Sequence, residues 1–375
     1  MHAHNDPPSG TALGISAPLS PSVAFADYAG RDRFGALDGL RCLCILAVIW
    51  HHGPVWDAMA PPPLVLTRGF LGVDFFFVLS GFLITTLLLR ETARKGHFSL
   101  RDFYRRRLLR IVPVYFFVVT AVSAYFILIK GQWQHAVLVP YYYLFLANFL
   151  TSDIPLLTPT WSLSVEEQYY MVWPLLLLIL PGRAVLPVLG LLIALNVAGI
   201  MGLFALFGLQ APAIGPLRIA LPNATYAPIL MGSALALLLD DRRGFSTLFR
   251  LFGHRLAPLA LLLAVIGLAA VLPMDLRGLP NLVLHLAMTA CLASLVLRED
   301  HVLAKVLAFA PVARVGTISY GIYLYHLIGL HMATVLMGLL GMASPWALLL
   351  VYTVASIVIS EISYRSLEAW FRRLR

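Results

Sequence analysis

The chain has 375 residues, of which 60% are hydrophobic and only 12% are charged. Soluble domains carry about 25% charged residues, so this composition excludes an ordinary soluble domain. It predicts an all-α, polytopic integral membrane helix bundle that forms one compact unit. The formal net charge is +9, and the basic residues lie mainly between apolar segments. Retention of Lys and Arg in cytoplasmic loops explains this excess better than nucleic-acid binding does.

The N-terminal lead, residues 1–33, is rich in Pro, Gly, Ser and Ala and is predicted to be disordered. It lacks the basic-then-apolar order of a cleavable signal peptide. The membrane domain is expected to cover residues 34–370, and residues 371–375 are expected to form a basic cytoplasmic tail.

Eleven apolar segments follow the lead. Segment 138–150 is too short to span a bilayer comfortably, carries a proline and is rich in tyrosine, so we expect a re-entrant or interfacial segment there. The other segments predict about ten transmembrane helices. Their approximate limits are 36–56, 70–89, 111–130, 164–180, 184–206, 225–239, 256–273, 280–297, 317–340 and 345–365.

The distribution of basic residues predicts how these spans are oriented. The connections 90–110, 240–255 and 298–316 and the C-terminal tail are basic, so all of them are expected on the cytoplasmic side. Arg31 and Arg33 precede the first span and favour the same side for the N-terminus. Both termini are thus predicted to be cytoplasmic, which requires an even number of crossings, and the first span runs outward.

Arg41 and His52 lie in the first span, separated by the uncharged residues CLCILAVIWH. Eleven helical steps make three turns plus about 20°, so the two side chains share one face, roughly 16 Å apart along the axis. His51 points roughly 80° away. An arginine and a histidine inside a span are costly and usually mark a site. Arg41, toward the cytoplasm, and His52, toward the far side, are therefore candidate catalytic residues.

Asp74 lies near the outer end of the second span, on the same side as His52. A carboxylate within reach would fix the imidazole tautomer and stabilise its charged form. Capping of the helix N-terminus explains Asp74 equally well. Ser80 and Gly81, farther along this span, are interpreted as residues of close helix packing.

Arg107 and Arg110 end the basic loop and sit three residues apart on one helical face at the membrane surface. Guanidinium groups bind phosphates well because their fork geometry matches the oxyanion. For this pair taken alone, the simpler explanation is that the two arginines help to hold the loop on the cytoplasmic side, as the basic residues of any such loop do.

Two adjacent glutamates lie in the stretch PTWSLSVEEQYY. Ser164 and Glu167 match the Ser-x-x-Glu capping box, so Glu167 is interpreted mainly as a structural residue. Glu166 has no such explanation and is the better functional candidate.

Near the C-terminus, Tyr320, Tyr323 and His326 recur at a spacing of three. An aromatic stripe of this kind is more typical of packing or of an interface belt. His326 is therefore a weaker candidate than His52. Three further histidines have no supporting context, namely His285, His301 and His331.

The three cysteines, Cys42, Cys44 and Cys291, all sit in apolar segments. They show neither a CxxC motif nor paired histidine spacing. We therefore expect neither a disulfide framework nor a metal site.

Five sequence blocks in this order resemble the integral-membrane acyltransferase 3 family, whose members O-acylate sugars and related acceptors. The blocks are LDGLRCLCILAVIWHH, GVDFFFVLSGFLI, FYRRRLLRIVPVY, PTWSLSVEEQYY and ISYGIYLYH, and the resemblance runs from about residue 34 to residue 370. The family's arginine and histidine, ten residues between them, match Arg41 and His52. Its Arg-x-x-Arg pattern matches Arg107 and Arg110, and its glutamate matches Glu166.

The resemblance implies an enzyme of the bacterial cytoplasmic (inner) membrane. Such an enzyme moves an acyl group, with acetyl expected, from cytoplasmic acyl-CoA to a hydroxyl of a carbohydrate or glycosylated acceptor. Acyl-CoA would be a co-substrate, and no permanently bound cofactor, no metal and no nucleic-acid partner is expected. Some relatives carry a fused extracytoplasmic hydrolase-like domain, whereas this chain resembles the stand-alone form.

The candidate residues receive roles from this implied reaction. His52 would act as a general base on the acceptor hydroxyl or would accept the acyl group transiently, with Asp74 or Glu166 assisting it. Arg41 would stabilise the thioester oxyanion or the phosphopantetheine path. The cytoplasmic arginine pair, Arg107 and Arg110, would hold the CoA phosphates.

Two alternatives remain open from the sequence. A transporter or flippase of a lipid-linked sugar would use the same buried charges as substrate or proton sites, although no inverted repeat is visible between the two halves of the sequence. A catalytically inactive scaffold is the second alternative. The joint presence of the candidate arginines, histidine and glutamate argues against it.

Overall fold

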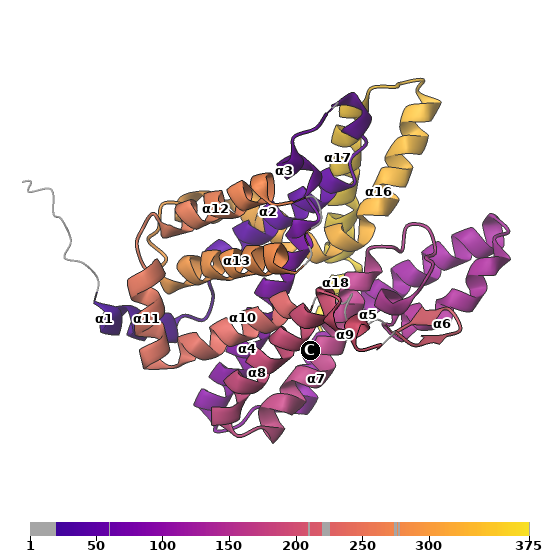
Figure 1. Cartoon of the computed structure of the whole chain (residues 1–375). Coiled ribbons are helices and arrows are strands. Elements are labelled where there is room, and N and C mark those ends of the chain that lie inside the picture. The colour runs from indigo at the N-terminus through magenta and orange to yellow at the C-terminus, as the bar shows by residue number, and fades with distance from the viewer. Residues whose placement is uncertain are drawn as a thin grey trace, which may run out of the picture.

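The computed structural model describes residues 20–59, 61–208, 211–219, 226–273, 276 and 278–374. The described residues form a bundle of helices with one small β-hairpin (Figure 1). The first helices are α1 (Pro21–Gly30), α2 (Ala36–His51), η1 (Trp56–Ala58), α3 (Leu64–Thr67), α4 (Leu71–Lys95), α5 (Leu100–Ala124), η2 (Tyr125–Ile129), η3 (Trp133–Leu138), α6 (Val139–Tyr143) and η4 (Ala147–Phe149). The middle contains α7 (Thr160–Ile179), α8 (Gly182–Ile200), α9 (Leu203–Leu206), β1 (Ala213–Ile214) and β2 (Leu217–Arg218). The remaining helices are α10 (Ala227–Asp240), α11 (Arg242–Phe252), α12 (Ala257–Val271), α13 (Leu279–Leu297), α14 (Ala304–Leu307), α15 (Ala310–Thr317), α16 (Ser319–Leu339), α17 (Pro345–Arg365) and α18 (Leu367–Arg372).

Six of the described helices are long and apolar enough to cross a membrane, and the count rises to seven if α11 and α12, bent by 74°, form one broken span. The predicted class, an all-α membrane protein, is therefore confirmed. Each of the ten predicted spans contains a helix, but α2, α7 and α10 do not meet the same criteria of length and composition. The number ten thus stays a prediction.

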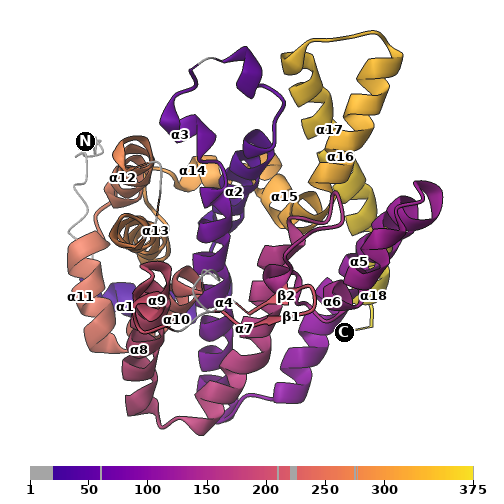
Figure 2. The ribbon, with the colours of Figure 1, turned by 45° about the vertical axis from the view of Figure 1, so that its right-hand side comes forward.

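Helix α4 forms the centre of the bundle (Figure 2). The most apolar 18-residue stretch of α4 is 78% buried, whereas the corresponding stretch of the peripheral α8 is 17% buried. Helix α4 packs closely on α10 because two glycines lie at the contact. A Cβ at Gly81 would overlap the Ile229 carbonyl, and one at Gly232 would overlap the Val78 carbonyl. The interpretation of Gly81 as a packing residue is confirmed, since small residues let membrane helices approach this closely.

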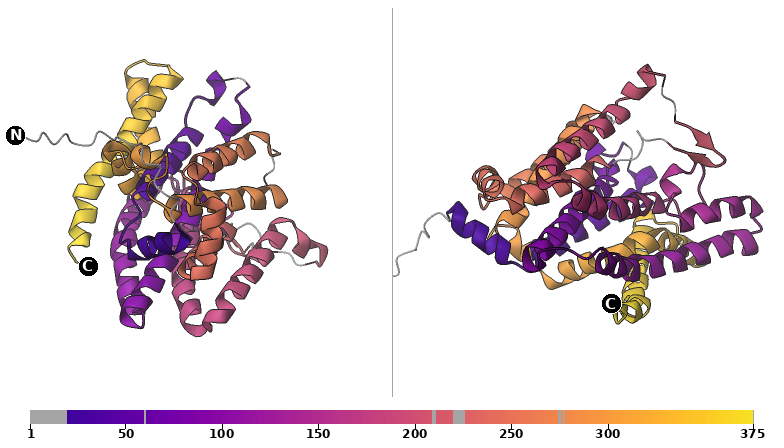
Figure 3. Two further views of the ribbon diagram at one scale, coloured as in Figure 1. Left: turned by 90° about the vertical axis from the view of Figure 1, so that its left-hand side faces the viewer. Right: turned by 90° about the horizontal axis from the view of Figure 1, so that it is seen from below.

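Two further close contacts fix the helices that carry the candidate histidines. A Cβ at Gly316 of α15 would overlap the Asp38 carbonyl at the start of α2, and one at Gly329 of α16 would crowd Ser356 of α17. The hairpin of α16 and α17 projects from one end of the bundle (Figures 1 and 2). In the view from below, α1 and the α5–α6 region lie at opposite edges of the molecule (Figure 3).

The prediction that residues 1–33 are disordered is wrong for residues 21–30. Residues 21–30 form α1, which starts with Ser20 as N-cap and a proline in its first turn. Its Ala24 and Tyr28 are buried, and the Tyr28 ring packs against Phe245 of α11. Burial of this aromatic face offsets the weak helix signal of the sequence. Residues 1–19 lie outside the described part of the chain.

The segment 138–150 contains only short helical pieces, the end of η3, α6 and η4. Phe145 adopts a positive φ of 54° between α6 and η4, which a helix crossing the membrane would not contain. The segment is thus not one continuous spanning helix, and its re-entrant or interfacial position stays a prediction.

Candidate active site

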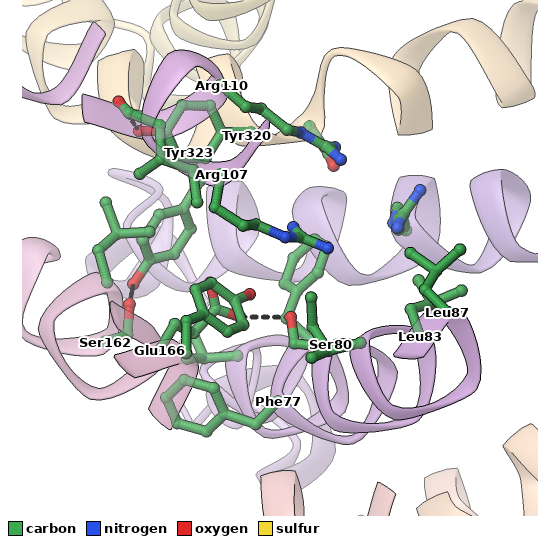
Figure 4. A pocket seen from close by; sticks show the side chains of 18 residues that line it. Phe77, Ser80, Leu83, Leu87, Arg107, Arg110, Ser162, Glu166, Tyr320 and Tyr323 are labelled. Carbon is green, nitrogen blue, oxygen red and sulfur yellow. Dashed lines mark hydrogen bonds between the residues drawn. The ribbon is translucent and has the colours of Figure 1, made fainter. Parts of the chain in front are cut away.

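A cavity of about 230 Å³ lies between α2, α4, α5, α7 and α16 (Figure 4), and we call it the arginine pocket. An apolar cavity with a few convergent polar groups is the typical form of a ligand site. Its polar lining consists of Arg41, Ser80, Arg107, Arg110, Ser162, Glu166, Tyr170, Ser319, Tyr320 and Tyr323. Its apolar lining consists of Val73, Phe76, Phe77, Leu83, Ile84, Leu87, Ile111 and Leu163.

Three predicted site residues, Arg41, Arg107 and Arg110, converge on the arginine pocket although they come from two helices. Arg41 donates a 2.8 Å hydrogen bond to the carboxylate of Asp38, one turn earlier on α2. The Arg107 guanidinium lies over the Tyr170 ring, 5.1 Å from its centroid. Three guanidinium groups around one cavity make it suited to an anionic ligand.

Glu166 faces the same pocket and accepts a 2.5 Å hydrogen bond from the Ser80 hydroxyl (Figure 4). Arg107 and Arg110 act electrostatically on its carboxylate. The pocket therefore combines a carboxylate acceptor with guanidinium donors. The interpretation of Ser80 as a packing residue is wrong, because its hydroxyl is directed across the helix interface to Glu166.

The predicted capping box of Ser164 and Glu167 is also wrong. Helix α7 begins at Thr160, so both residues lie inside it. The Ser164 hydroxyl instead donates to the Thr160 carbonyl at 3.1 Å and accepts from the Ala147 amide at 3.2 Å. Glu167 is buried, and its Oε1 has no hydrogen-bond partner in the described part of the chain.

His52 lies outside the lining of the arginine pocket. It is the C-cap of α2, and its Nδ1 lies 3.0 Å from the Val48 carbonyl. A carbonyl can only accept, so Nδ1 carries the proton and Nε2 keeps its lone pair. The His52 ring contacts the His326 ring edge to face, with 4.9 Å between centroids.

His51 differs from His52 in its surroundings. Its Nδ1 lies 3.1 Å from the Thr67 carbonyl, and its ring packs on Phe70. These contacts tie α2 to the segment that precedes α4. They give His51 a structural explanation that His52, directed toward α16, does not share.

Asp74 is not directed to His52. It lies in the first turn of α4, and its Oδ2 is 3.3 Å from Nε2 of His285 on α13, without hydrogen-bond geometry. Both side chains are buried. The expectation that Asp74 assists His52 is therefore corrected, and His285, which had no supporting context in the sequence, has a carboxylate neighbour.

Sequence patterns do not identify several residues of the pocket as site residues. Tyr320 and Tyr323 line the pocket. Their regular spacing is more typical of packing, but it also indicates a shared helical face. Tyr320 donates a 3.0 Å hydrogen bond to the Ile111 carbonyl. Ser162 and Tyr170 had no sequence signal of their own.

The fold and the pocket define a membrane-embedded helical protein with a cationic site between its spans. Among the described residues, no group of three or more His, Cys, Asp or Glu side chains is arranged to hold a metal ion. The family described as "Acyltransferase domain" matches residues 34–365. The chain belongs to this acyltransferase 3 family.

Two bacterial relatives are similar over most of the chain. The peptidoglycan O-acetyltransferase OatA of Listeria monocytogenes is 28% identical over an alignment of 365 residues that covers 92% of this chain and 56% of the relative. The putative peptidoglycan O-acetyltransferase YrhL of Bacillus subtilis is 30% identical over 357 residues, 88% of this chain and 54% of the relative. A putative O-acetyltransferase of Staphylococcus aureus is 32% identical over 175 residues, 43% of this chain and 28% of the relative.

The chain thus spans about half the length of the first two relatives. No solved structure matches it.

Proposed function

We propose that this protein is an O-acyltransferase that moves an acyl group, in the first place acetyl, from acyl-CoA to a hydroxyl of a carbohydrate. The observation that carries the proposal is the convergence of Arg41, Arg107, Arg110 and Glu166 on one pocket. Membership of the acyltransferase 3 family supports it. Two relatives are named peptidoglycan O-acetyltransferases, so peptidoglycan is the first acceptor to test.

The proposed enzyme crosses a bacterial inner membrane about ten times, with both termini in the cytoplasm. In this orientation the basic start of α5 lies on the cytoplasmic side, where acyl-CoA is available. The outward end of α2, which carries His52, lies toward the acceptor. The acyl group would then pass from the arginine pocket, on the donor side, to His52, on the acceptor side.

The donor would enter the arginine pocket from the cytoplasm. Arg110 is exposed and Arg107 is partly buried, so this pair would bind the phosphates at the entrance, where two guanidinium forks match phosphate oxygens. A cavity of about 230 Å³ is smaller than the roughly 300–1,000 Å³ of common ligand pockets. It would therefore enclose only the acyl and pantetheine end of the donor.

The chemical step would use the two ends of this arrangement. Arg41 would stabilise the negative charge that develops on the thioester oxygen. His52 Nε2 would take the proton of the acceptor hydroxyl, or would carry the acyl group transiently. Glu166, which contacts Ser80 rather than His52, would orient the donor in the pocket.

A transfer assay tests the proposal. Membranes containing the full chain are incubated with labelled acetyl-CoA and solubilised peptidoglycan fragments, and label in the glycan is measured. We expect transfer by the wild-type protein, a loss of at least about 100-fold in His52→Ala and a much smaller change in His51→Ala. A transporter or flippase would give no labelled glycan, and loss of activity only in His51→Ala would refute the role of His52.

A further inference from the structure

His326 on α16 is fully buried. Its Nδ1 lies 2.6 Å from the Tyr323 carbonyl on the same helix. Because a carbonyl accepts and cannot donate, the proton is on Nδ1 and the lone pair is on Nε2. The ring is thus held in one tautomer, with its basic nitrogen free.

That basic nitrogen is one of eight buried side-chain polar atoms without a hydrogen-bond partner among the described residues. Nε2 of His326 is buried and has no hydrogen-bond partner among the described residues. Buried polar atoms are almost always hydrogen-bonded, and an unpaired one needs an explanation. The function described so far gives His326 no role.

The neighbour of His326 across the helix interface is His52. The two rings meet edge to face at 4.9 Å and an interplanar angle of 62°. His52 has the same tautomer, since its Nδ1 is bonded to the Val48 carbonyl. Two imidazoles with fixed Nδ1 protons and basic Nε2 atoms therefore lie in contact.

His326 also connects His52 with the arginine pocket. The Tyr323 ring contacts the His326 ring at 5.7 Å and lines the pocket. The Tyr323 hydroxyl is hydrogen-bonded to the hydroxyl of Ser162, another lining residue, at 2.7 Å. His326 thus lies on the side of His52 that faces the donor.

We propose that His326 is the second base of a His52–His326 pair and receives at Nε2 the proton that His52 takes from the acceptor hydroxyl. This inference rests on the proposed acyl transfer. In that reaction the acceptor O–H bond breaks, an ester C–O bond forms and the thioester C–S bond breaks. The leaving thiolate needs a proton, and one has left the acceptor, so the pair would hold the proton on the side toward the donor.

The surroundings of His326 contain few other ionisable groups. His52 and His51 act on it from α2, and Tyr323 packs on it from its own helix. On the side of α17 and α18, the groups beside Gly329 and Gly321 are the neutral Ser356 and Ser360 and the Glu368 carboxylate. Oε1 of Glu368 lies 3.6 Å from the Cβ position of Gly321, more than one helical turn before His326. A change at Nε2 is therefore expected to act mainly through His52.

Two substitutions separate the basic Nε2 from the structural bond at Nδ1. In His326→Asn the amide nitrogen takes the place of Nδ1 and can still donate to the Tyr323 carbonyl, but no group replaces Nε2. In His326→Gln the amide lies closer to the place of Nε2, without its basicity. His331→Asn on the same helix is the control, because His331 is directed to Tyr125 of the neighbouring segment.

The assay uses the purified full chain in vesicles, acetyl-CoA and solubilised peptidoglycan fragments. We expect kcat to fall about 10- to 100-fold in both His326 variants, with an unchanged KM for acetyl-CoA and no effect of His331→Asn. The acid limb of the kcat–pH profile should move to lower pH, since the His52 imidazolium loses the neighbour that shares its proton.

A His326→Asn or His326→Gln enzyme with kcat within about twofold of wild type and an unchanged pH profile would overturn the proposal. If one variant does not fold, as judged by gel filtration in detergent, the other decides. Failure of the wild-type protein to transfer acetyl would instead refute the proposed function, so the two failures are distinguishable.

Discussion

Ser80 on α4 donates a 2.5 Å hydrogen bond to the carboxylate of Glu166 on α7. This bond joins the central helix of the bundle to the helix that carries the Trp-Ser-Leu-Ser motif. It directs the carboxylate into the arginine pocket (Figure 4). The pocket therefore owes its only acidic lining residue, among those described, to a contact between two helices that are distant in the sequence.

Glu166 and its neighbour Glu167 provide a matched pair of variants. Glu166→Gln removes the charge that faces Arg107 and Arg110 while keeping the shape, and we expect acetyl transfer to fall at least about 100-fold. Glu167→Gln should retain most of the activity, because Glu167 is not part of the pocket lining. Ser80→Ala should give an intermediate loss of about 10-fold, the value of one charged hydrogen bond. Equal losses in both glutamine variants, measured with labelled acetyl-CoA, would contradict this assignment.

The arginines at the pocket entrance should determine the affinity for the donor. Arg107→Gln and Arg110→Gln are each expected to raise the KM for acetyl-CoA about 10-fold or more, because a guanidinium–phosphate contact is lost. The effect should shrink at high salt for Arg110, which is the more exposed of the two.

Arg105→Gln is the control for the donor-binding prediction. Arg105 belongs to the same basic run but donates to the Leu374 carbonyl outside the pocket. The KM of the Arg105→Gln enzyme for acetyl-CoA should stay unchanged. A rise equal to that of Arg107→Gln would mean that the whole basic run, and not the pocket, attracts the donor.

Asp74 and His285 should matter for stability and not for chemistry. Their side chains are buried, and Oδ2 of Asp74 lies 3.3 Å from Nε2 of His285. A neutral substitution of either residue removes the electrostatic contact between these buried groups, at a cost of about 1–3 kcal/mol. We expect Asp74→Asn and His285→Gln each to lower the midpoint of thermal unfolding in detergent. The decrease in this midpoint for the double variant should be smaller than the sum of the two single decreases. A selective loss of kcat in Asp74→Asn at unchanged stability would instead support the original expectation that Asp74 assists His52.

The contact between α4 and α10 predicts a strong effect of a single methyl group. Gly81→Ala would place a Cβ against the Ile229 carbonyl, and such overpacking costs about 1–3 kcal/mol or more. Gly190→Ala on α8 is the matched control, because a Cβ there meets no atom within 4 Å. Thermal unfolding should therefore shift for Gly81→Ala only. A similar shift for both variants would show that the helical glycine itself, and not the contact, is responsible.

The class of the protein and most of its helices could be predicted because they depend on local properties. The apolar segments and the positions of the basic connections follow from the chain itself, and helices form in each of the ten expected spans. The three-residue spacing of Arg107 and Arg110 likewise correctly predicted a shared helical face, and both residues line the pocket. Helix α1 was missed, since it is stabilised by the packing of Tyr28 on α11.

By itself the sequence determined an all-α membrane protein and the residues that carry charge inside it. It also determined the helix on which Arg41 and His52 lie. Only the tertiary structure decided which of these residues meet: Glu166 with Ser80, Asp74 with His285, and His52 with His326. The physical reason is that helical periodicity defines the face on which a side chain lies. The neighbour of that face depends on close contacts between distant helices, such as the one at Gly81.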